Sequence, residues 1–185
     1  MGQIKVQHDA GGIKGLCVIT PTVHGDKRGY FSETFNQRDM NDAGLDYVFV
    51  QDNQSSSTKG VLRGLHFQIH YPQTKLVRVI RGSVYDVAVD VRKGSQTFGK
   101  YYGEILTDEN HKQLLIPKGF AHGFLVLSDF AEFCYKCDDF WHPNDEGGII
   151  WNDPEINIAW PEVDVALNII ERDSKLPTLK EAVLP

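Results

Sequence analysis

The stretch LVRVIRGSVYDVAVDV (residues 76–91) predicts two β-strands joined by a tight turn. Both arms are rich in valine, and Gly82-Ser83 between them is typical of a turn. In the second arm, alternate side chains fall on opposite faces of the strand. One face carries Tyr85, Val87, Val89 and Val91, and the other carries Asp86, Ala88 and Asp90.

Similar short segments occur along most of the chain and indicate an all-β protein. Strands are expected at 13–20, 30–35, 47–50, 101–106, 113–116, 123–127 and 131–137. The close spacing of the turns favours a sandwich or barrel over βαβ units. A polar run covers 51–55, and short helices are expected at 36–43, ended by Gly44, and at 176–182.

Length and composition indicate one globular domain of 185 residues, with 41% hydrophobic and 24% charged residues. The net charge of -6 argues against a nucleic-acid binder. No apolar run is long enough to span a membrane, and residues 1–10 lack the apolar stretch of a signal peptide. Three cysteines fit a reducing compartment, so a cytoplasmic location is expected. Cys134 and Cys137 lack the second pair that a zinc site needs.

The stretch GVLRGLHFQ (residues 60–68) holds the first candidate for catalysis, His66. A lone histidine is usually a core residue bonded to a backbone carbonyl, but glycines and an arginine surround this one. In a regular strand, Arg63 and His66 would face opposite sides. We therefore predict a bulge at Gly64 that brings both side chains to one pocket.

Three further segments carry candidates, each with a structural alternative. His122 follows a Pro-x-Gly turn and is as readily structural as functional. Tyr135 is on an inward face, as a core residue or as a general acid in a cavity. Asp173 is in a charged triplet that is either a solvated surface or folds back to orient His66. Arginine and lysine side chains suit anions, and the candidates are Arg28, Arg63, Lys75 and Arg172.

His66 and the segment Pro117-x-Gly119-x-x-His122 resemble the two motifs of the cupin barrel. Metal-binding cupins carry His-x-His, then a glutamate and a final histidine. This chain has Gln68 and Lys75 instead, and a lysine repels a cation. Metal binding is therefore not expected, which also disfavours a metal-dependent cupin oxygenase.

The metal-free pattern resembles the dTDP-4-dehydrorhamnose 3,5-epimerase family. The matching segments are 26–31, 51–55, 60–68, 75–79, 84–92, 95–99, 119–124, 135–137 and 151–154. The resemblance implies a cupin-type jelly-roll β-barrel with short peripheral helices, formed by residues 1–185 as a single domain. Strands within 1–50 would contribute to a homodimer, and the tail 161–185 would pack back near the active site.

The resemblance also implies a reaction. The C4 ketone of dTDP-4-dehydro-6-deoxy-D-glucose acidifies the protons on C3 and C5, and epimerisation gives dTDP-4-dehydro-L-rhamnose. By similarity, His66 is the base, oriented by Asp173, and Tyr135 is the acid on the opposite face. Lys75, with Arg63, would stabilise the enolate oxygen. No cofactor is required.

Substrate-binding positions follow from the same resemblance. Arg28 and Glu33 would reach a neighbouring active site across the dimer, and Gln51 and Asn53 would lie near the thymidine. His122, Glu146 and Arg172 would contact substrate. Trp141 departs from the tyrosine of many relatives, which leaves Tyr135 as the proton donor. Alternatives are a mono-epimerase or ketoisomerase on a related dTDP-keto-sugar, and a non-catalytic sugar-binding cupin.

Overall fold

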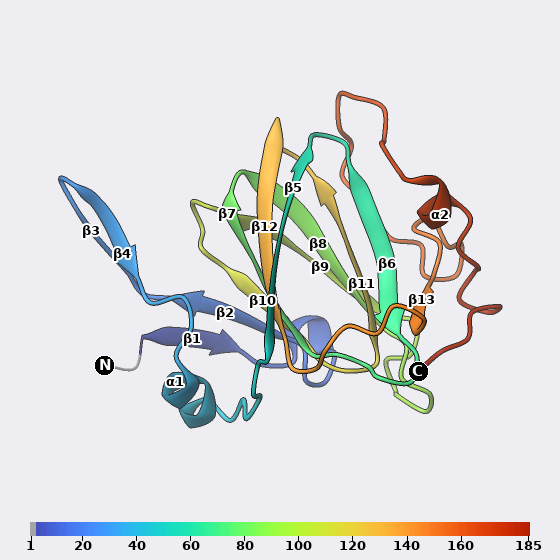
Figure 1. Cartoon of the computed structure of the whole chain (residues 1–185), viewed down its shortest axis with the longest axis horizontal. Helices are drawn as coiled ribbons and strands as arrows, with labels where there is room; N and C mark the ends of the chain where they lie inside the picture. Colours follow the sequence, from blue (N-terminus) through green and yellow to red (C-terminus); the bar gives the residue numbers. More distant parts are fainter. Residues whose placement is uncertain (1–2) are drawn as a thin grey trace.

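The computed structural model describes residues 3–185 and contains two antiparallel β-sheets that face each other (Figure 1). The six-stranded sheet has the order β1 (Ile4–Gln7), β2 (Cys17–Pro21), β10 (Gln113–Ile116), β7 (Lys75–Arg81), β12 (Phe130–Cys137), β5 (Gln51–Thr58). The five-stranded sheet has the order β13 (Glu146–Gly148), β6 (Leu62–Gln68), β11 (Phe120–Val126), β8 (Ser83–Asp90), β9 (Tyr101–Thr107). The predicted all-β jelly roll is confirmed.

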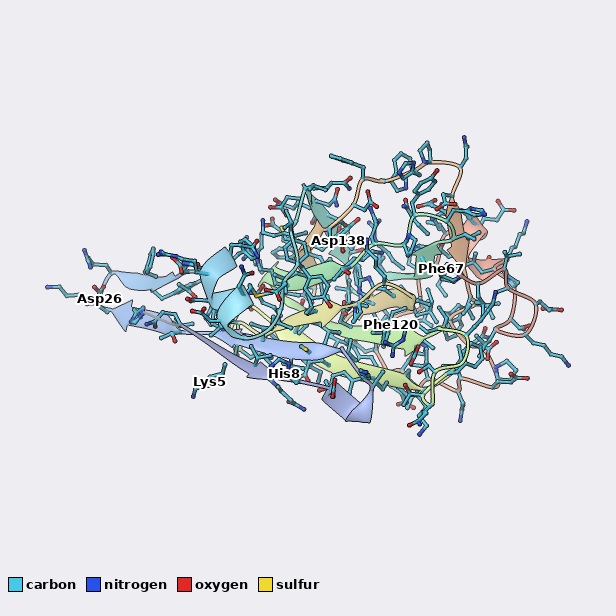
Figure 2. The ribbon with its side chains drawn as sticks, turned by 90° about the horizontal axis from the view of Figure 1, so that it is seen from below. Lys5, His8, Asp26, Phe67, Phe120 and Asp138 are labelled. Carbon is cyan, nitrogen blue, oxygen red and sulfur yellow. The ribbon has the colours of Figure 1, made fainter. Side chains whose placement is uncertain are left out.

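The remaining elements lie outside the two sheets. Strands β3 (Val23–Asp26) and β4 (Gly29–Ser32) form a hairpin that projects from the body of the protein. Figure 2 shows the tip of this hairpin, near Asp26, at the opposite end of the molecule from Phe67. The short helices are η1 (Ala10–Gly12), α1 (Gln37–Asp42) and α2 (Glu171–Ser174). Within residues 3–185, no helix is both long and apolar enough to cross a lipid bilayer.

The main core fills the space between the sheets, because each strand alternates its side chains between two faces. Strand β8 shows how both faces are used. Val84 and Ala88 point into the main core, whereas Val87 and Val89 pack against a second core on the outer face of the five-stranded sheet. The residues of the C-terminal segment that cover that outer face are Ile149, Ile156, Ile158 and Leu179.

Helix α1 and its flanking loop cover the outer face of the six-stranded sheet. Asn36 caps the helix, since its side chain accepts hydrogen bonds from the backbone N–H groups of Arg38 and Asp39. Gly44 follows with φ +75°, a conformation that suits glycine at a helix end. The predicted helix at 36–43 is therefore confirmed. Met40 and Leu45 pack on the sheet beneath it.

Three expectations were wrong in detail. Residues 176–182 do not form the predicted helix but contain turns, because Leu179 packs into the outer core and the Thr178 hydroxyl bonds Glu181. The helix of this segment lies earlier, at Glu171–Ser174. Residues 47–50 do not form a strand. The polar run that follows them is instead the start of strand β5, with its side chains alternately inward and exposed.

Candidate active site

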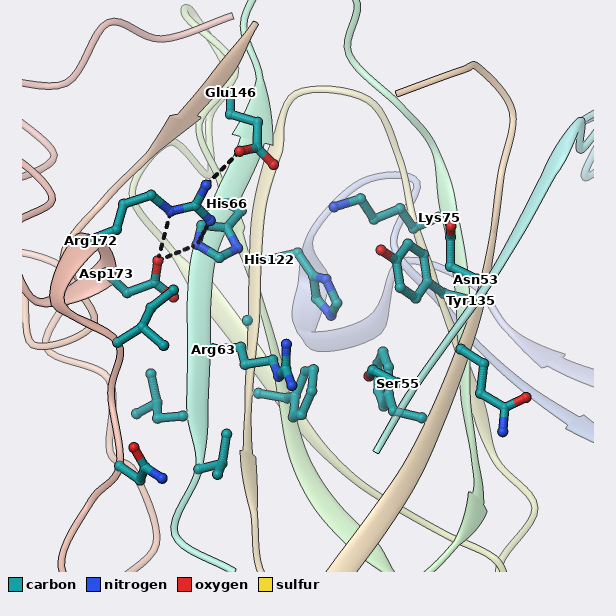
Figure 3. A pocket seen from close by; sticks show the side chains of 18 of the residues that line it. Asn53, Ser55, Arg63, His66, Lys75, His122, Tyr135, Glu146, Arg172 and Asp173 are labelled. Carbon is teal, nitrogen blue, oxygen red and sulfur yellow. Dashed lines mark hydrogen bonds and ion pairs between the residues drawn. The ribbon is translucent and has the colours of Figure 1, made fainter. Parts of the chain in front are cut away.

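A cavity of about 700 Å³ lies between the two sheets and is lined by polar side chains from both (Figure 3). A second cavity of about 460 Å³ adjoins it and shares part of its wall. The shared residues are Asn53, His66, Lys75, Tyr135 and Glu146. The two cavities together can accommodate an elongated polar ligand.

Strand β6 brings Arg63 and His66 to the same cavity through an irregularity at Gly64. Opposite β11, His66 pairs with His122 and Arg63 pairs with Phe124, so β6 contains one more residue than its partner across this step. Gly64 has φ +105°, and its N–H donates to Asp173 Oδ2 at 3.1 Å. The bulge predicted at Gly64 is confirmed, as is its effect on the two side chains.

Replacement of Gly64 by alanine is expected to destabilise the protein by about 3 kcal/mol, because the site disfavours a side chain in two ways. Its φ is positive, and a Cβ atom would lie 2.6 Å from the carbonyl oxygen of His122 and 2.7 Å from Gly123 Cα. Gly44→Ala is the matched control, since its φ is +75° and no atom would lie within 4 Å of the added Cβ. We expect that variant to lose only about 1 kcal/mol in urea unfolding. Equal losses in the two variants would contradict the steric explanation.

His66 and Asp173 form a hydrogen-bonded pair, although 107 residues separate them in sequence. His66 Nε2 lies 2.9 Å from Asp173 Oδ1, and the carboxylate is almost completely buried. Burial alone would raise the pKa of Asp173, but the hydrogen bond from His66 and the N–H of Gly64 lower it overall. A carboxylate acceptor fixes the proton on Nε2 and leaves the lone pair on Nδ1 for a ligand.

Arg172 lies against this pair and is held by Glu146. Its Nη1 donates to Glu146 Oε2 at 2.6 Å, and its Nε donates to Asp173 Oδ1 at 3.4 Å. Nη2 of Arg172 is also 3.4 Å from His66 Nε2. Nε2 cannot donate to Asp173 and accept from Arg172 at once, so the shorter carboxylate contact decides its tautomer. The indole of Trp141 donates to Glu146 Oε1 at 3.2 Å and extends this network to the rim.

Tyr135 and Lys75 lie on the opposite side of the cavity from His66 (Figure 3). They come from adjacent strands of the six-stranded sheet, and Lys75 Nζ is 5.9 Å from the centre of the tyrosine ring. Burial raises the pKa of the Tyr135 hydroxyl, which keeps it protonated, and lowers the pKa of the Lys75 ammonium group. Lys75 has no hydrogen-bonded partner within residues 3–185, so its charge is available to a ligand.

His122 lies between these two groups and has its own carboxylate, Asp86, which sequence reasoning missed. Its Nε2 is 2.9 and 3.1 Å from the two oxygens of Asp86, whose side chain is fully buried. The available signal was an aspartate on the strand face that also carries Val84, Ala88 and Asp90, in a strand that is otherwise rich in valine. An acidic side chain in a valine-rich strand indicates a buried polar partner.

The predicted nucleotide-side residues lie on strand β5. Gln51 donates to Asn53 Oδ1 at 3.1 Å and accepts from the backbone N–H of Trp141 at 3.0 Å. Ser57, on the same inward face, accepts from both Nε and Nη2 of Arg63, at 3.1 and 2.9 Å. Strand β5 therefore supplies a row of small polar groups to the cavity wall.

Arg28 and Glu33 are not brought to this cavity within the chain. Arg28 lies at the tip of the β3–β4 hairpin and bonds to Asp26, and Glu33 accepts a hydrogen bond from Asn36 near the base of the hairpin. The other predicted site residues all line one of the two adjoining cavities, and Ser57, which was not predicted, supports Arg63 in the wall.

The family model for dTDP-4-dehydrorhamnose 3,5-epimerase matches residues 11–181. The chain belongs to this family. The epimerase of Methanothermobacter thermautotrophicus is 52% identical over 170 residues, which is 91% of this chain and 92% of that relative. The family is one of isomerases, so the chain is an enzyme of that class.

Solved structures of epimerases have the same fold. The dTDP-6-deoxy-D-glucose-3,5-epimerase of Legionella pneumophila, in complex with dTDP-4-keto-L-rhamnose, gives a TM-score of 0.91 at 46% identity. The match covers 96% of this chain and 94% of that one. The 3'-monoepimerase ChmJ of Streptomyces bikiniensis, in complex with dTDP-quinovose, gives 0.84 at 34% identity, over 90% and 85% of the two chains. Fold alone therefore does not distinguish one epimerised carbon from two.

The donor atoms at the cupin metal positions do not suit a divalent cation. His66 and His122 each direct Nε2 to an aspartate, and the Gln68 amide oxygen accepts the N–H of His142. Lys75 adds a positive charge to the same wall. A cation bound here would meet the ammonium group of Lys75, and the two histidines would offer it one Nδ1 atom each, fewer than the three or four protein ligands that a zinc site takes.

Proposed function

We propose that the protein epimerises dTDP-4-dehydro-6-deoxy-D-glucose at C3 and C5 to give dTDP-4-dehydro-L-rhamnose. The observation that carries this proposal is the placement of His66 and Tyr135 on opposite sides of one cavity (Figure 3). Inversion of a carbon centre needs a base on one face of the sugar ring and an acid on the other. Family membership supplies the substrate class.

In the proposed mechanism, His66 Nδ1 takes the proton from the carbon next to the C4 ketone. Asp173 holds the opposite ring nitrogen and stabilises the imidazolium that forms. The electron pair of the broken C–H bond forms a double bond between that carbon and C4, and the negative charge moves to the C4 oxygen, which gives an enolate. Tyr135 then gives its proton to the same carbon from the other face, and the carbonyl re-forms.

Lys75 and Arg63 provide the positive charge that the enolate needs. Both line the cavity, and within residues 3–185 neither forms an ion pair with a carboxylate. Donors that are already fixed in place stabilise developing charge without reorganisation. Because the C4 carbonyl of the substrate accepts the electrons, we propose no cofactor or metal in the reaction.

Deuterium uptake from solvent tests the proposed activity. The sugar nucleotide is incubated with the enzyme in D₂O, and the product is examined by proton NMR. Label at both C3 and C5, with inverted configuration, is the expected result. Label at C3 alone would establish the alternative, a mono-epimerase, which the similarity to ChmJ keeps as the second candidate. Absence of label at either carbon would overturn the proposal.

We also propose that the protein acts in the cytoplasm as a homodimer in which strands within residues 1–50 contribute to the interface. The projecting hairpin supports this assembly, since Tyr30 and Phe31 are more than 60% exposed on it and Arg28 lies at its tip. Large exposed apolar side chains on one element are typical of an interaction surface. Arg28 and Glu33 would then complete the site of the neighbouring subunit.

Mixing two inactive variants tests the shared site. Arg28→Ala and His66→Asn proteins, denatured together and refolded, are expected to recover activity, because half of the sites in each mixed dimer contain both wild-type residues. His66→Asn mixed with Asp173→Asn is the control and should remain inactive, since both residues belong to the same chain's site. No recovery in the first mixture, with dimers shown by light scattering, would refute the shared site.

A further inference from the structure

The structure contains a second histidine–carboxylate pair next to His66 and Asp173. His122 lies directly opposite His66 in the register of β6 and β11, so the two imidazoles share the face that points into the cavity. Asp86 lies on the next strand, β8, two residues from the position opposite His122. Three adjacent strands thus place Asp86, His122 and His66 on the same inward face.

Asp86 differs from the other buried aspartates in what it binds. Four of them accept backbone N–H groups and so fix a loop, a turn or a bulge, and these are Asp90, Asp145, Asp153 and Asp173. Within residues 3–185, both oxygens of Asp86 contact only His122 Nε2. Its inward neighbours along β8 are Val84 and Ala88, and Glu104, directly opposite it on β9, is bonded to Tyr102 and Lys112 instead. Since a buried carboxylate is costly, a carboxylate that secures no backbone is best explained by its effect on the histidine.

The carboxylate also determines what His122 can offer to a ligand. A carboxylate accepts, so Nε2 carries the proton and the neutral ring keeps its lone pair on Nδ1. Within residues 3–185, Nδ1 of His122 has no hydrogen-bond partner. Among these residues, the one completely buried side-chain nitrogen or oxygen that lacks a partner is Thr74 Oγ1, so Nδ1 of His122 is not completely buried. It is therefore accessible, and the space next to His122 is the cavity. The ring of Phe133 lies next to the imidazole, with the ring centres 6.1 Å apart and the planes 24° from parallel.

We infer that Asp86 is a positioning residue that fixes the His122 tautomer, so that Nδ1 accepts a hydrogen bond from a hydroxyl group of the bound sugar. This inference rests on the proposed function for the identity of the ligand. It assigns different tasks to two similar pairs. Asp173 supports the ring that takes protons from carbon, whereas Asp86 supports the ring that orients the sugar for that step.

The test compares Asp86→Asn with Asp153→Asn. Asparagine at 86 has nearly the same shape but can present either its amide oxygen or its N–H₂ group to Nε2, so the tautomer of His122 is no longer fixed. We expect kcat/KM to fall by about 10- to 100-fold. Imidazole ¹⁵N NMR should show the single Nε2–H tautomer of His122 replaced by a mixture of the Nε2–H and Nδ1–H tautomers. Asp153→Asn removes an acceptor for the N–H groups of Glu155, Ile156 and Leu179, so it should lower the melting temperature and leave the His122 signals unchanged.

A double-mutant cycle separates positioning from general structure. In a His122→Asn background, Asp86→Asn should have no further effect on kcat/KM. Equal losses in both backgrounds, or unchanged ¹⁵N signals in Asp86→Asn, would overturn the inference. If the asparagine variant does not fold, Asp86→Leu removes the carboxylate and serves in its place, with loss of a fixed tautomer as the expected result. The NMR measurement of the His122 tautomer does not require turnover. A wild-type protein that took up no deuterium would therefore refute the proposed function, but the effect of Asp86 on the His122 tautomer could still be tested.

Discussion

His66→Asn protein is expected to lose solvent deuterium incorporation at both carbons, with a fall in kcat of about 10³-fold or more. Asparagine occupies similar space and can still bond Asp173, but it has no lone pair basic enough to take a proton from carbon. Binding of dTDP, measured by calorimetry, should change little, because the nucleotide lies away from the base in the proposed arrangement. The variant therefore separates chemistry from binding.

Asp173→Asn is the informative companion to that variant. It keeps the shape of the buried side chain and an oxygen for the N–H of Gly64, but the histidine loses the carboxylate that fixes its tautomer. We expect a loss of about 10²-fold or more, with the overall fold retained. Full exchange in His66→Asn would rule out His66 as the base, whatever the result for Asp173→Asn.

Lys75→Met is expected to lower kcat by about 10²- to 10³-fold, because the enolate would form without its nearest fixed positive charge. Methionine has a similar length and tolerates a half-buried site. KM should change less than kcat, since the charge on the C4 oxygen develops only as the proton leaves carbon. A variant with raised KM and unchanged kcat would show that Lys75 binds the substrate without stabilising the enolate.

The pH dependence of the same step follows from the burial of Lys75. Its pKa is lowered from the usual 10.5, so the ammonium charge is lost at a lower pH than for an exposed lysine. As the pH rises, activity should therefore decline at a lower pH than the one at which an exposed lysine loses its proton. Lys75→Arg keeps its charge across this range, so the alkaline decline should move to higher pH even if kcat falls. An identical alkaline decline in both proteins would assign it to another group.

Much of the fold was predictable because the inter-sheet core uses valine and leucine at a period of two. Strand β5 was missed as a strand for the complementary reason. Of its inward residues, Asn53 and Ser55 face a cavity and Ser57 bonds Arg63, so the strand lacks the apolar alternation by which strands are recognised. The tail was also misjudged, because Leu179 is buried from a turn and a hydrophobic pattern alone does not reveal that.

The site was predictable to the extent that it lies on one strand. The glycines around Arg63 and His66 predicted the bulge that the structure shows. Asp173 could be named as a candidate partner of His66 only because it is acidic. The sequence does not reveal a contact between two residues that are 107 positions apart. Asp86 was visible as an acidic residue in a valine-rich strand, but only the strand register assigns it to His122.

The distance in sequence between His66 and Asp173 has a consequence for when the protein becomes active. The barrel strands end at residue 148, whereas the carboxylate proposed to complete the base comes from a later segment that lies along the edge of β6. A chain whose barrel has closed but whose tail is undocked would lack a competent base. In the proposed mechanism, the base is thus complete only when the barrel and the tail are both in place.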